Sequence, residues 1–537
     1  MSIDSVTLNI VGTALGGIAR EMAANLRHAA FSSIVREARD FAVAVCDAKG
    51  EVISQPDDTI PMMTLGISQA FLGLRERVDI GRLTPDDAIL FNDPFTRGQH
   101  LQDVYLFTPI FHGDRLVAFA CSTAHHVDLG GGAPGLNPFA EEIYQEGLRL
   151  PAAVFSISRD WNGGFVESVV RANVRVPDIV VGDLNAQFAA NHTATERVRE
   201  LCDRYGADLL VAVMDQLKDY AEARLRDNIR AIPDGVYTAT EPIDAASCGG
   251  VPAQVVAAVT VAGSDISVDF TGTSDQVTTN INCPIASAHS AVHAAVRGLL
   301  EESDIPFNEG CNRPITLTAP YGSLLNPRPP AAVRARLTPA SRAFDAVIRA
   351  LAQAVPDRAV APGFDTTTSA ALSHIDRSTG SYQVVVEIMG GGWGASAGHD
   401  GADGLDNPIS NCQNAPIEAL ETDYDHFRLV EYSLVDGSGG DGAWRGGMGF
   451  RRVYAATRDN VQFAGYADRH AYTATGLFGG TPGAPGRFRV LRTDGTEEVL
   501  PTLTSVHLNE GDQIEVITGG GGGYGDPAER ESSDRPG

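Results

Sequence analysis

The sequence predicts a multi-domain α+β protein with mixed sheets, hairpins and flanking helices, and with a strand-rich C-terminal half. Its 537 residues exceed what one hydrophobic core usually organises, so roughly two to four domains are expected. Hydrophobic residues make up 43% and charged residues 20% of the chain, which is typical of well-packed globular proteins. Helical periodicity recurs before residue 381, whereas short strands and glycine loops dominate after it.

The first elements are a helix and two hairpins. Residues 5–39 carry apolar side chains at intervals of three and four, which predicts an amphipathic helix. Residues 40–55 are predicted to form a β-hairpin that turns at 47–50. A second hairpin is predicted at 103–124, with its turn at 112–114.

Three later stretches have few helix breakers and are predicted to be helical: 184–231, 284–302 and 340–356. Short strands begin at about residue 235, and glycine clusters punctuate the chain after residue 380. These changes predict an N-terminal α+β domain, a central α+β domain, a β-rich and glycine-rich region, and a disordered tail, with bounds 1–235, 236–380, 381–525 and 526–537.

Charge and composition exclude several classes of function. The net charge of −27 argues against a nucleic-acid partner or an anionic membrane, because phosphate groups require a basic face. No apolar run reaches the roughly 18–20 residues of a membrane span, and no signal peptide is visible. The seven cysteines form no CxxC pair, which favours buried free thiols in a reducing cytosol. We therefore expect a cytoplasmic protein.

Two polar motifs lie at the two ends of the second hairpin. They are FNDPFTRGQHLQDV at 91–104 and AHHVDLGGG at 124–132. With a three-residue turn, Asp103 and His125 would be diagonal neighbours on one face of the hairpin, because side chains on a strand share a face every second residue. With a two-residue turn, His126 would take the place of His125. Spacing alone leaves both arrangements open.

These motifs supply the ligand types of a catalytic metal site. His100, in the loop before the hairpin, would add a second imidazole to the site. Two imidazoles and one carboxylate leave positions open for water or substrate, which is typical of catalytic Zn²⁺, Mn²⁺ or Fe²⁺ sites. His126 and Asp128 are expected beside the ligands, with Asp128 orienting an imidazole. In the competing interpretation, all these groups are hydrogen-bonded structural residues at a hairpin end.

The same motifs resemble those of the hydantoinase B/oxoprolinase family, whose members typically carry NDP…GG.H..D and AHH.D.GG. Further stretches resemble the family in the family's order along essentially the whole chain: EEIYQEGLRLP (141–151), NVRVPDIVVGDLNAQFAA (173–190), VDFTGTSDQV (268–277), DGSGGDGAWRGGMG (436–449) and GGGGYGDP (520–527). So many long motifs in one order identify the chain as a member of this family.

The resemblance implies the metal-dependent B subunit of an ATP-dependent cyclic-amide hydrolase, such as N-methylhydantoinase, 5-oxoprolinase or caprolactamase. A separate hydantoinase A-like subunit would bind ATP and phosphorylate the ring carbonyl oxygen, and water activated by the metal would then attack the carbonyl carbon. The family also resembles subunits of acetone and acetophenone carboxylases, whose two ligand imidazoles lie 25 positions apart. The same separation here selects His100, Asp103 and His125 as ligands.

Within EEIYQEGLRLP, the side chains of Glu142, Tyr144 and Glu146 are candidates for acid/base work near the metal. A polar loop that enters a strand explains the same residues equally well. The glycine runs include no GxxxxGK[ST] motif, so they predict flexible lids or tight packing rather than a phosphate cradle. ATP is accordingly expected on the partner subunit.

One departure and three rival functions accompany this prediction. Family members usually have a PVHLG-like run after the first hairpin, whereas this chain has PMMTLG at 61–66, so the substrate pocket is expected to differ. The rivals are a carboxylase subunit that uses phosphorylated bicarbonate, a non-catalytic scaffold for the ATPase subunit, and a stand-alone metallohydrolase.

Overall fold

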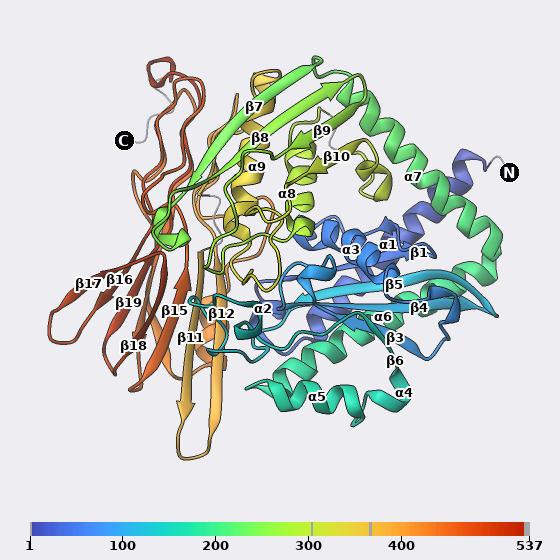
Figure 1. Cartoon of the computed structure of the whole chain (residues 1–537), viewed down its shortest axis with the longest axis horizontal. Coiled ribbons are helices and arrows are strands. Elements are labelled where there is room, and N and C mark those ends of the chain that lie inside the picture. The colour runs from blue at the N-terminus through green and yellow to red at the C-terminus, as the bar shows by residue number, and fades with distance from the viewer. Residues whose placement is uncertain (1–2, 302–303, 365–367, 531–537) are drawn as a thin grey trace.

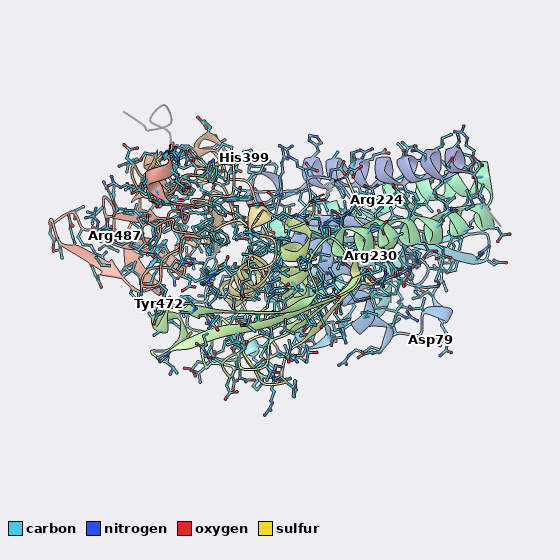
Figure 2. All side chains as sticks on the ribbon, turned by 90° about the horizontal axis from the view of Figure 1, so that it is seen from above. Asp79, Arg224, Arg230, His399, Tyr472 and Arg487 are labelled. Atoms are coloured by element: carbon cyan, nitrogen blue, oxygen red, sulfur yellow. The ribbon has the colours of Figure 1, made fainter. Side chains whose placement is uncertain are left out.

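The computed structural model describes residues 3–301, 304–364 and 368–530. Four β-sheets with flanking helices make up the described chain, which confirms the predicted multi-domain α+β class. The N-terminal sheet and its helices lie on one side of the molecule and the C-terminal sheets on the other, with the central sheet above them (Figure 1). Seen from above, the molecule is elongated, with the helix that carries Arg224 far from the strand that carries Arg487 (Figure 2).

The N-terminal sheet is antiparallel and has the strand order β2-β1-β5-β4-β3-β6. Its strands are β1 (Phe41–Asp47), β2 (Val52–Ser54), β3 (Asp87–Phe91), β4 (Asp103–His112), β5 (Arg115–His125) and β6 (Ala153–Ser156). The two predicted hairpins are β1–β2 and β4–β5. Because β1 pairs with β5, the two hairpins join into one sheet and bring their ends together.

Seven helices belong to this part of the chain: α1 (Ser5–Ala29), α2 (Ser33–Arg36), α3 (Pro61–Arg75), α4 (Ile157–Asp160), α5 (Phe165–Asn173), α6 (Pro177–Tyr205) and α7 (Ala207–Ile229). The helix predicted over 5–39 therefore ends at Ala29, because the Asp183 side chain accepts the N–H groups of Phe31 and Ser32 and holds them outside a helix. The stretch predicted at 184–231 is two helices that meet at Gly206, which has a φ of 81°.

The N-terminal sheet is covered by a different helix on each face. Phe71 of α3 packs edge-on against Phe107 and Phe119, with ring centroids 5.4 and 4.9 Å apart. On the opposite face, Gln187 of α6 donates a hydrogen bond to the Val104 carbonyl. Because side chains alternate along a strand, odd-numbered residues at the start of β4 face α3 and even-numbered ones face α6.

The central part consists of a four-stranded sheet and two helices. The sheet has the order β10-β9-β8-β7 and the strands β7 (Gly235–Ile243), β8 (Ala253–Ala262), β9 (Asp265–Asp269) and β10 (Ile315–Thr318). Helix α9 (Leu337–Leu351) packs on β7 and β8, and α8 (Ile285–Gly298) lies between α9 and α3. These two helices confirm the helices predicted at 284–302 and 340–356, and they connect the central sheet to the N-terminal one.

The C-terminal part is a sandwich of two sheets. One has the order β12-β11-β15-β18 and the other the order β13-β14-β19-β16-β17. Apolar side chains of both sheets share one core, which includes Leu372, Phe427, Phe463 and Phe488. The bounds are β11 (Thr368–Asp376), β12 (Ser381–Met389), β13 (Phe427–Leu434), β14 (Phe450–Ala456), β15 (Val461–Tyr466), β16 (Arg487–Leu491), β17 (Glu497–Leu500), β18 (Leu503–Leu508) and β19 (Gln513–Ile517), with α10 (Ile417–Asp423) before β13.

The glycine-rich loops pack directly against one another beside this sandwich. Gly521 donates to the carbonyl of Gly447, Gly447 donates to the carbonyl of Trp393, and Gly440 donates to the carbonyl of Gly521. A Cβ atom on Gly521 or Gly446 would overlap a backbone carbonyl oxygen of the adjacent segment. These glycines therefore permit backbone-to-backbone packing, which agrees with tight packing and not with a phosphate cradle.

Three further predictions concern the tail, the cysteines and the membrane. Residues 526–530 continue from the glycine loops, and Arg530 pairs with Asp400 at 2.8 Å. Residues 531–537 of the tail predicted to be disordered lie outside the described residues. All seven cysteines are free and buried, as predicted. Among the described helices, none combines the length and apolar character required to cross a bilayer.

Candidate metal centre

Three neighbouring strands of the N-terminal sheet bring polar residues to one edge. Asp40 immediately precedes β1, Asp103 begins β4 and His125 ends β5, which lies between them. The N–H of His125 donates to the Asp40 carbonyl at 3.0 Å, and Asp103 lies directly opposite His125 in the antiparallel register. Directly opposed residues of an antiparallel pair project to the same face, so both side chains point towards the α3 side.

The observed register corrects the one predicted from a three-residue turn. Asp103 and His125 are opposite each other and not diagonal neighbours. The turn contains two residues, Gly113 and Asp114, and the register then shifts where Ile110 and Phe111 of β4 meet a bulge in β5. A bulge adds one unpaired residue, so it reverses which side chains of β5 share a face with Asp103.

His100 reaches this pair from the loop before β4. Its Nε2 lies 2.9 Å from Asp103 Oδ1 and 3.2 Å from His125 Nδ1, and those two atoms are 3.3 Å apart. Two ligand atoms bound about 2.1 Å from one ion, at angles of about 90–110°, lie roughly 3.0–3.4 Å from each other. All three side chains are buried, and His125 Nε2 has no hydrogen-bond partner among the described residues. The three atoms therefore fit a divalent cation by both spacing and donor type.

Burial and nearby charges set the protonation of this cluster. Burial, together with the charge of Arg336, lowers the pKa of His100 to about 4. Burial also holds the pKa of His125 well below its usual value. For Asp103, burial acts to raise the pKa, but the Arg336 guanidinium and the neighbouring histidines outweigh it and hold the pKa well below its usual range. The groups are therefore two neutral imidazoles and a carboxylate, which are the forms that ligate a metal.

A segment just before α9 holds the ligands in place. Arg336 Nη2 donates to Asp103 Oδ2 at 2.5 Å and to Gln99 Oε1 at 3.0 Å. His100 Nδ1 lies 3.0 Å from the Arg334 carbonyl oxygen and 2.9 Å from Arg336 Nη1. The tautomer that donates from Nδ1 to the carbonyl leaves the Nε2 lone pair directed at Asp103 and His125, which is the metal-binding form, whereas the tautomer protonated at Nε2 accepts at Nδ1 from Arg336.

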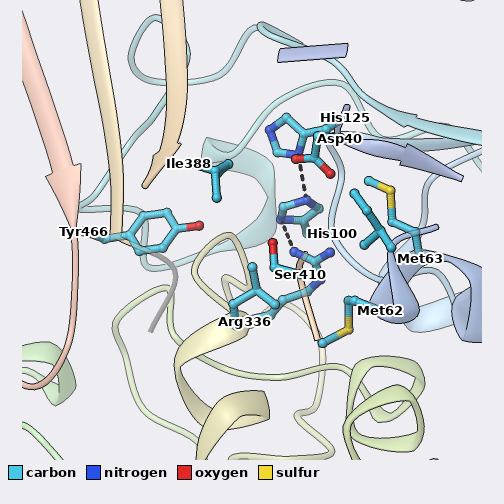
Figure 3. Close-up of a pocket in the computed structure, with 11 residues that line it drawn as sticks. Asp40, Met62, Met63, His100, His125, Arg336, Ile388, Ser410 and Tyr466 are labelled. Carbon is cyan, nitrogen blue, oxygen red and sulfur yellow. Dashed lines mark hydrogen bonds and ion pairs between the residues drawn. The ribbon is translucent and has the colours of Figure 1, made fainter. Parts of the chain in front are cut away.

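The triad faces a buried pocket with largely apolar walls (Figure 3). Met62 and Met63 of α3 lie on one side of His100, and Ile388 of β12 and Tyr466 of β15 lie on the other. The remaining lining residues are Asp40, Ile60, His125, Arg336, Leu337 and Ser410. The PMMTLG departure therefore lies in the wall of this pocket, with two thioethers in the run where family members usually carry a histidine.

The two other polar residues predicted near the ligands are placed differently. His126 points to the opposite face of β5, where its Nε2 lies 3.0 Å from Gln187 Oε1 of α6. Asp128 binds Arg175 at 2.8 Å and accepts the backbone N–H groups of Arg175 and Gly130. Neither side chain contacts an imidazole of the triad in the described structure. Asp128 instead fixes the loop that follows the hairpin.

The three candidate acid/base residues differ in burial. The Glu142 and Tyr144 side chains are exposed and do not line the pocket of the triad. Glu146 is buried, and its Oε1 accepts the N–H groups of Val333 at 2.9 Å and Arg334 at 2.7 Å. It therefore binds the segment that carries Arg334 and leads to Arg336. Burial raises the pKa of the Glu146 carboxyl to about 8 despite these hydrogen bonds.

This raised pKa gives a testable dependence of stability on pH. The folded chain keeps Glu146 protonated to about pH 8, whereas the unfolded chain ionises it near pH 4.3. Stability is therefore fully present below about pH 4.3 and is lost as pH rises to about 8. Relative to Glu146→Gln, the free energy of unfolding of the wild type should fall by about 1 kcal/mol per pH unit between about pH 5 and 8. Paired urea titrations at several pH values measure this difference, and a constant difference would contradict it.

Sequence reasoning missed several residues around the triad. Asp40, Arg334, Arg336, Ser410 and Tyr466 all lie in or beside the pocket, yet none belongs to the two polar motifs. The sequence did give one indication for Asp40, because this acidic residue directly precedes a strand that was predicted to form a hairpin. The other four residues belong to the central and C-terminal parts of the chain, and no local sequence pattern distinguishes them as site residues.

Comparison with known proteins identifies the family. The family model of hydantoinase B/oxoprolinase matches residues 4–527. The chain is 34% identical over 545 residues to the B subunit of the "Putative D-/L-hydantoinase" of Pseudomonas sp. (strain NS671), with 98% of this chain and 91% of the relative covered. It is 30% identical over 550 residues to the beta chain of the caprolactamase of Pseudomonas jessenii, with 98% and 92% covered. A 5-oxoprolinase of Pestalotiopsis fici is 29% identical, and this chain covers 42% of its length.

Two solved structures share the fold. The ATP-dependent caprolactamase from Pseudomonas jessenii superimposes with a TM-score of 0.89 at 29% identity, with 99% of this chain and 93% of that chain covered. A nucleotide-free acetone carboxylase superimposes with a TM-score of 0.87 at 17% identity, over 98% and 76% of the two chains. At that lower identity the likeness shows the fold alone. With the family model matched over nearly the whole chain, the resemblance seen in the sequence is confirmed: the chain belongs to the hydantoinase B/oxoprolinase family.

Proposed function

We propose that this chain is the metal-dependent B subunit of an ATP-dependent cyclic-amide hydrolase. The observation that carries the proposal is the convergence of His100 Nε2, Asp103 Oδ1 and His125 Nδ1 in a buried pocket. The named relatives support it, because they are described as hydantoinase, caprolactamase and 5-oxoprolinase proteins and two of them as subunits. The substrate would be a hydantoin, a lactam or a similar ring.

The chain's own residues have distinct roles in this proposal. His100, Asp103 and His125 would hold a Zn²⁺, Mn²⁺ or Fe²⁺ ion, which when bound supplies Lewis-acid chemistry. Asp40 lines the same pocket, with Oδ2 3.6 Å from His125 Nδ1, and is placed to accept a proton from an attacking water. Arg336 keeps the Asp103 carboxylate ionised and oriented. Glu146 is proposed as a positioning residue, because it binds the backbone of the segment that leads to Arg336.

A hydantoinase A-like partner subunit is proposed to supply ATP. An unactivated amide is a poor electrophile, so phosphorylation of its carbonyl oxygen would make attack by water feasible. The glycine runs of this chain are occupied in packing against one another, and the sequence has no Walker-type lysine motif. The partner subunit would therefore activate the substrate by phosphorylation, and this chain would hydrolyse the activated substrate. The relative of known structure is described as an ATP-dependent caprolactamase.

The pocket walls favour an uncharged ring. Ile60, Met62, Met63, Leu337 and Ile388 contribute apolar surface, while Arg336 is engaged with Asp103 and Gln99. A substrate carboxylate, as in 5-oxoproline, would have to be buried against this largely apolar surface, and burying a charge is costly unless the charge is paired. We therefore expect kcat/KM for an uncharged lactam or hydantoin to exceed that for 5-oxoproline by about tenfold or more.

Reconstitution with an A-like subunit tests the function and this preference together. Purified chain, partner and ATP are incubated with a panel of lactams, hydantoins and 5-oxoproline, with and without bicarbonate, and ring-opened product and ADP are quantified. Ring opening that requires both subunits and ATP but not bicarbonate is the expected result. Bicarbonate-dependent ATP use with a ketone would instead establish the carboxylase function. Turnover without ATP or partner would establish a stand-alone metallohydrolase.

A further inference from the structure

A groove along α1 adjoins the metal pocket on its outer side. It lies between α1, the start of β1 and the loop at 56–59. We call it the arginine groove, and its charged and polar lining residues are Arg20, Arg27, His28, Arg39, Asp58 and Thr59. A concentration of guanidinium groups is notable in a chain whose net charge is −27, because most anions in solution are repelled from such a protein.

Three chain segments form the wall between the arginine groove and the metal pocket. Arg39 lines the groove and its neighbour Asp40 lines the pocket; likewise Thr59 lines the groove and Ile60 lines the pocket. A third segment repeats the pattern: Ser410 lines the pocket, and Asn411 lines the continuation of the groove towards the N-terminus of α1. At each of these places, two consecutive residues of one segment line the two sides of the wall.

The segments of the wall are hydrogen-bonded to one another: Gln413 N–H donates to the Ala38 carbonyl at 2.9 Å, and Met62 N–H donates to the Ile409 carbonyl at 2.8 Å. Asn411 Nδ2 donates to the Thr59 carbonyl at 3.3 Å. Arg39 and Asn411 both adopt left-handed backbone conformations, with φ of 57° and 50°. Such a conformation is uncommon for arginine and occurs preferentially at functional sites, whereas asparagine adopts it more readily. Both residues lie on the groove side of the wall, next to residues that line the metal pocket.

The guanidinium groups of the groove have only weak partners in the described structure. Arg39 Nη1 lies 3.5 Å from Asp58 Oδ2, and Arg20 Nη1 lies 3.5 Å from Asp57 Oδ2. Both aspartates are exposed, at 74% and 91%, so these pairs contribute little. Arg39 Nε is buried without a hydrogen-bond partner, and Arg27 donates from Nε to a backbone carbonyl at 3.4 Å. A buried N–H donor without a partner indicates a place for an acceptor.

We propose that the arginine groove binds the phosphoryl group of the activated substrate before the substrate reaches the metal pocket. This inference rests on the proposed function and names the ligand that the groove would take: a small molecule with a phosphoryl dianion. The forked donors of Arg20, Arg27 and Arg39 match phosphate oxygens, whereas the apolar pocket behind the wall suits the ring itself. The two parts of the substrate would thereby be recognised in sequence, first the phosphoryl group in the groove and then the ring in the pocket.

Calorimetric titration of the full chain with inorganic phosphate tests the site. We expect saturable binding with a Kd on the order of 1 mM, weakened about tenfold by Arg39→Gln and by Arg20→Gln. Arg199→Gln is the matched control, since Arg199 is 37% exposed on α6 and does not line the groove; it should bind phosphate like the wild type. Arg20 is 53% exposed on a helix, so its variant reports on the site even if Arg39→Gln folds poorly. Equal affinity in all four proteins would overturn the proposal.

Two further experiments distinguish phosphate binding in the groove from phosphate binding at the metal centre and from binding of free product phosphate. In His125→Ala, phosphate should still bind, because the groove contains no metal ligand; loss of binding there would place phosphate on the metal and overturn the groove site. In the reconstituted pair, Arg39→Gln should raise the ratio of ATP hydrolysed to ring opened, because activated substrate escapes before hydrolysis. An unchanged ratio with weakened phosphate binding would show a site for free phosphate only, which contradicts the loading role. Absence of ring opening in the wild type would count against the proposed function, while the binding arms would still decide the groove site.

Discussion

Replacing His125 with alanine is expected to abolish both metal binding and ring opening. His125 Nδ1 lies 3.2 Å from His100 Nε2 and 3.3 Å from Asp103 Oδ1, so its removal leaves two ligands in a buried site. Loss of groups that merely orient metal ligands costs 10- to 100-fold in affinity, so loss of a ligand should cost about 10³-fold or more. Elemental analysis of the purified chain should give about one equivalent of Zn, Mn or Fe in the wild type and none in the variant.

The adjacent histidine provides a matched control. His126 is as buried as His125 but points to the other face of β5, where it is paired with Gln187. His126→Gln keeps a hydrogen-bonding group at that position, so metal content and ATP-dependent ring opening should stay within a few-fold of the wild type. Activity that survives in His125→Ala would support the scaffold function. Metal loss in both variants would mean that the sheet edge, and not the ligand, had been disrupted.

This pair of neighbouring histidines also shows what the sequence could and could not predict. The hairpin and both polar motifs were predictable from local pattern. The register was not, because it depends on a bulge opposite Ile110 and Phe111 that no residue pattern marks. A one-residue change of register exchanges His125 for His126 on the ligand face. The family resemblance, and not the spacing, favoured His125.

The pocket was less predictable than the ligands for a physical reason. Its lining comes from segments separated by hundreds of positions, such as Asp40, Arg336 and Tyr466. Arg336 reaches Asp103 because α9 packs against α8, and α8 against α3, so that the central part of the chain lies over the edge of the N-terminal sheet. Such contacts follow from the packing of whole elements, and local periodicity carries no information about them.

The glycine clusters illustrate the opposite case, in which composition indicated the correct class of structure. The absence of a Walker-type motif predicted packing or lids, and the structure has glycine segments in backbone contact. The partners of each segment were not predictable, because glycine has no side chain whose size or polarity would specify one. Gly521 illustrates this, since it contacts Trp393 and Gly447 from two distant segments.

Gly521→Ala is therefore expected to destabilise the protein severely. An added Cβ would overlap the carbonyl oxygen and carbon of Trp393, which are backbone atoms that cannot rotate away. Either the Gly521–Gly447 hydrogen bond or the neighbouring chain must shift, so the free energy of unfolding should fall by about 4 kcal/mol or more. Thermal unfolding and the soluble yield of the purified variant measure the effect.

Gly17→Ala separates this steric effect from the general consequence of replacing glycine. Gly17 lies within α1, and an added Cβ there would meet nothing within 4 Å. Alanine is favoured over glycine in a helix by about 1 kcal/mol, so this variant should be slightly more stable than the wild type. Opposite signs for the two substitutions are expected if backbone contact explains the glycine clusters. A small effect of Gly521→Ala would instead mean that the segment can move away from Trp393, and the glycine loops would then act as lids and not as a packed core.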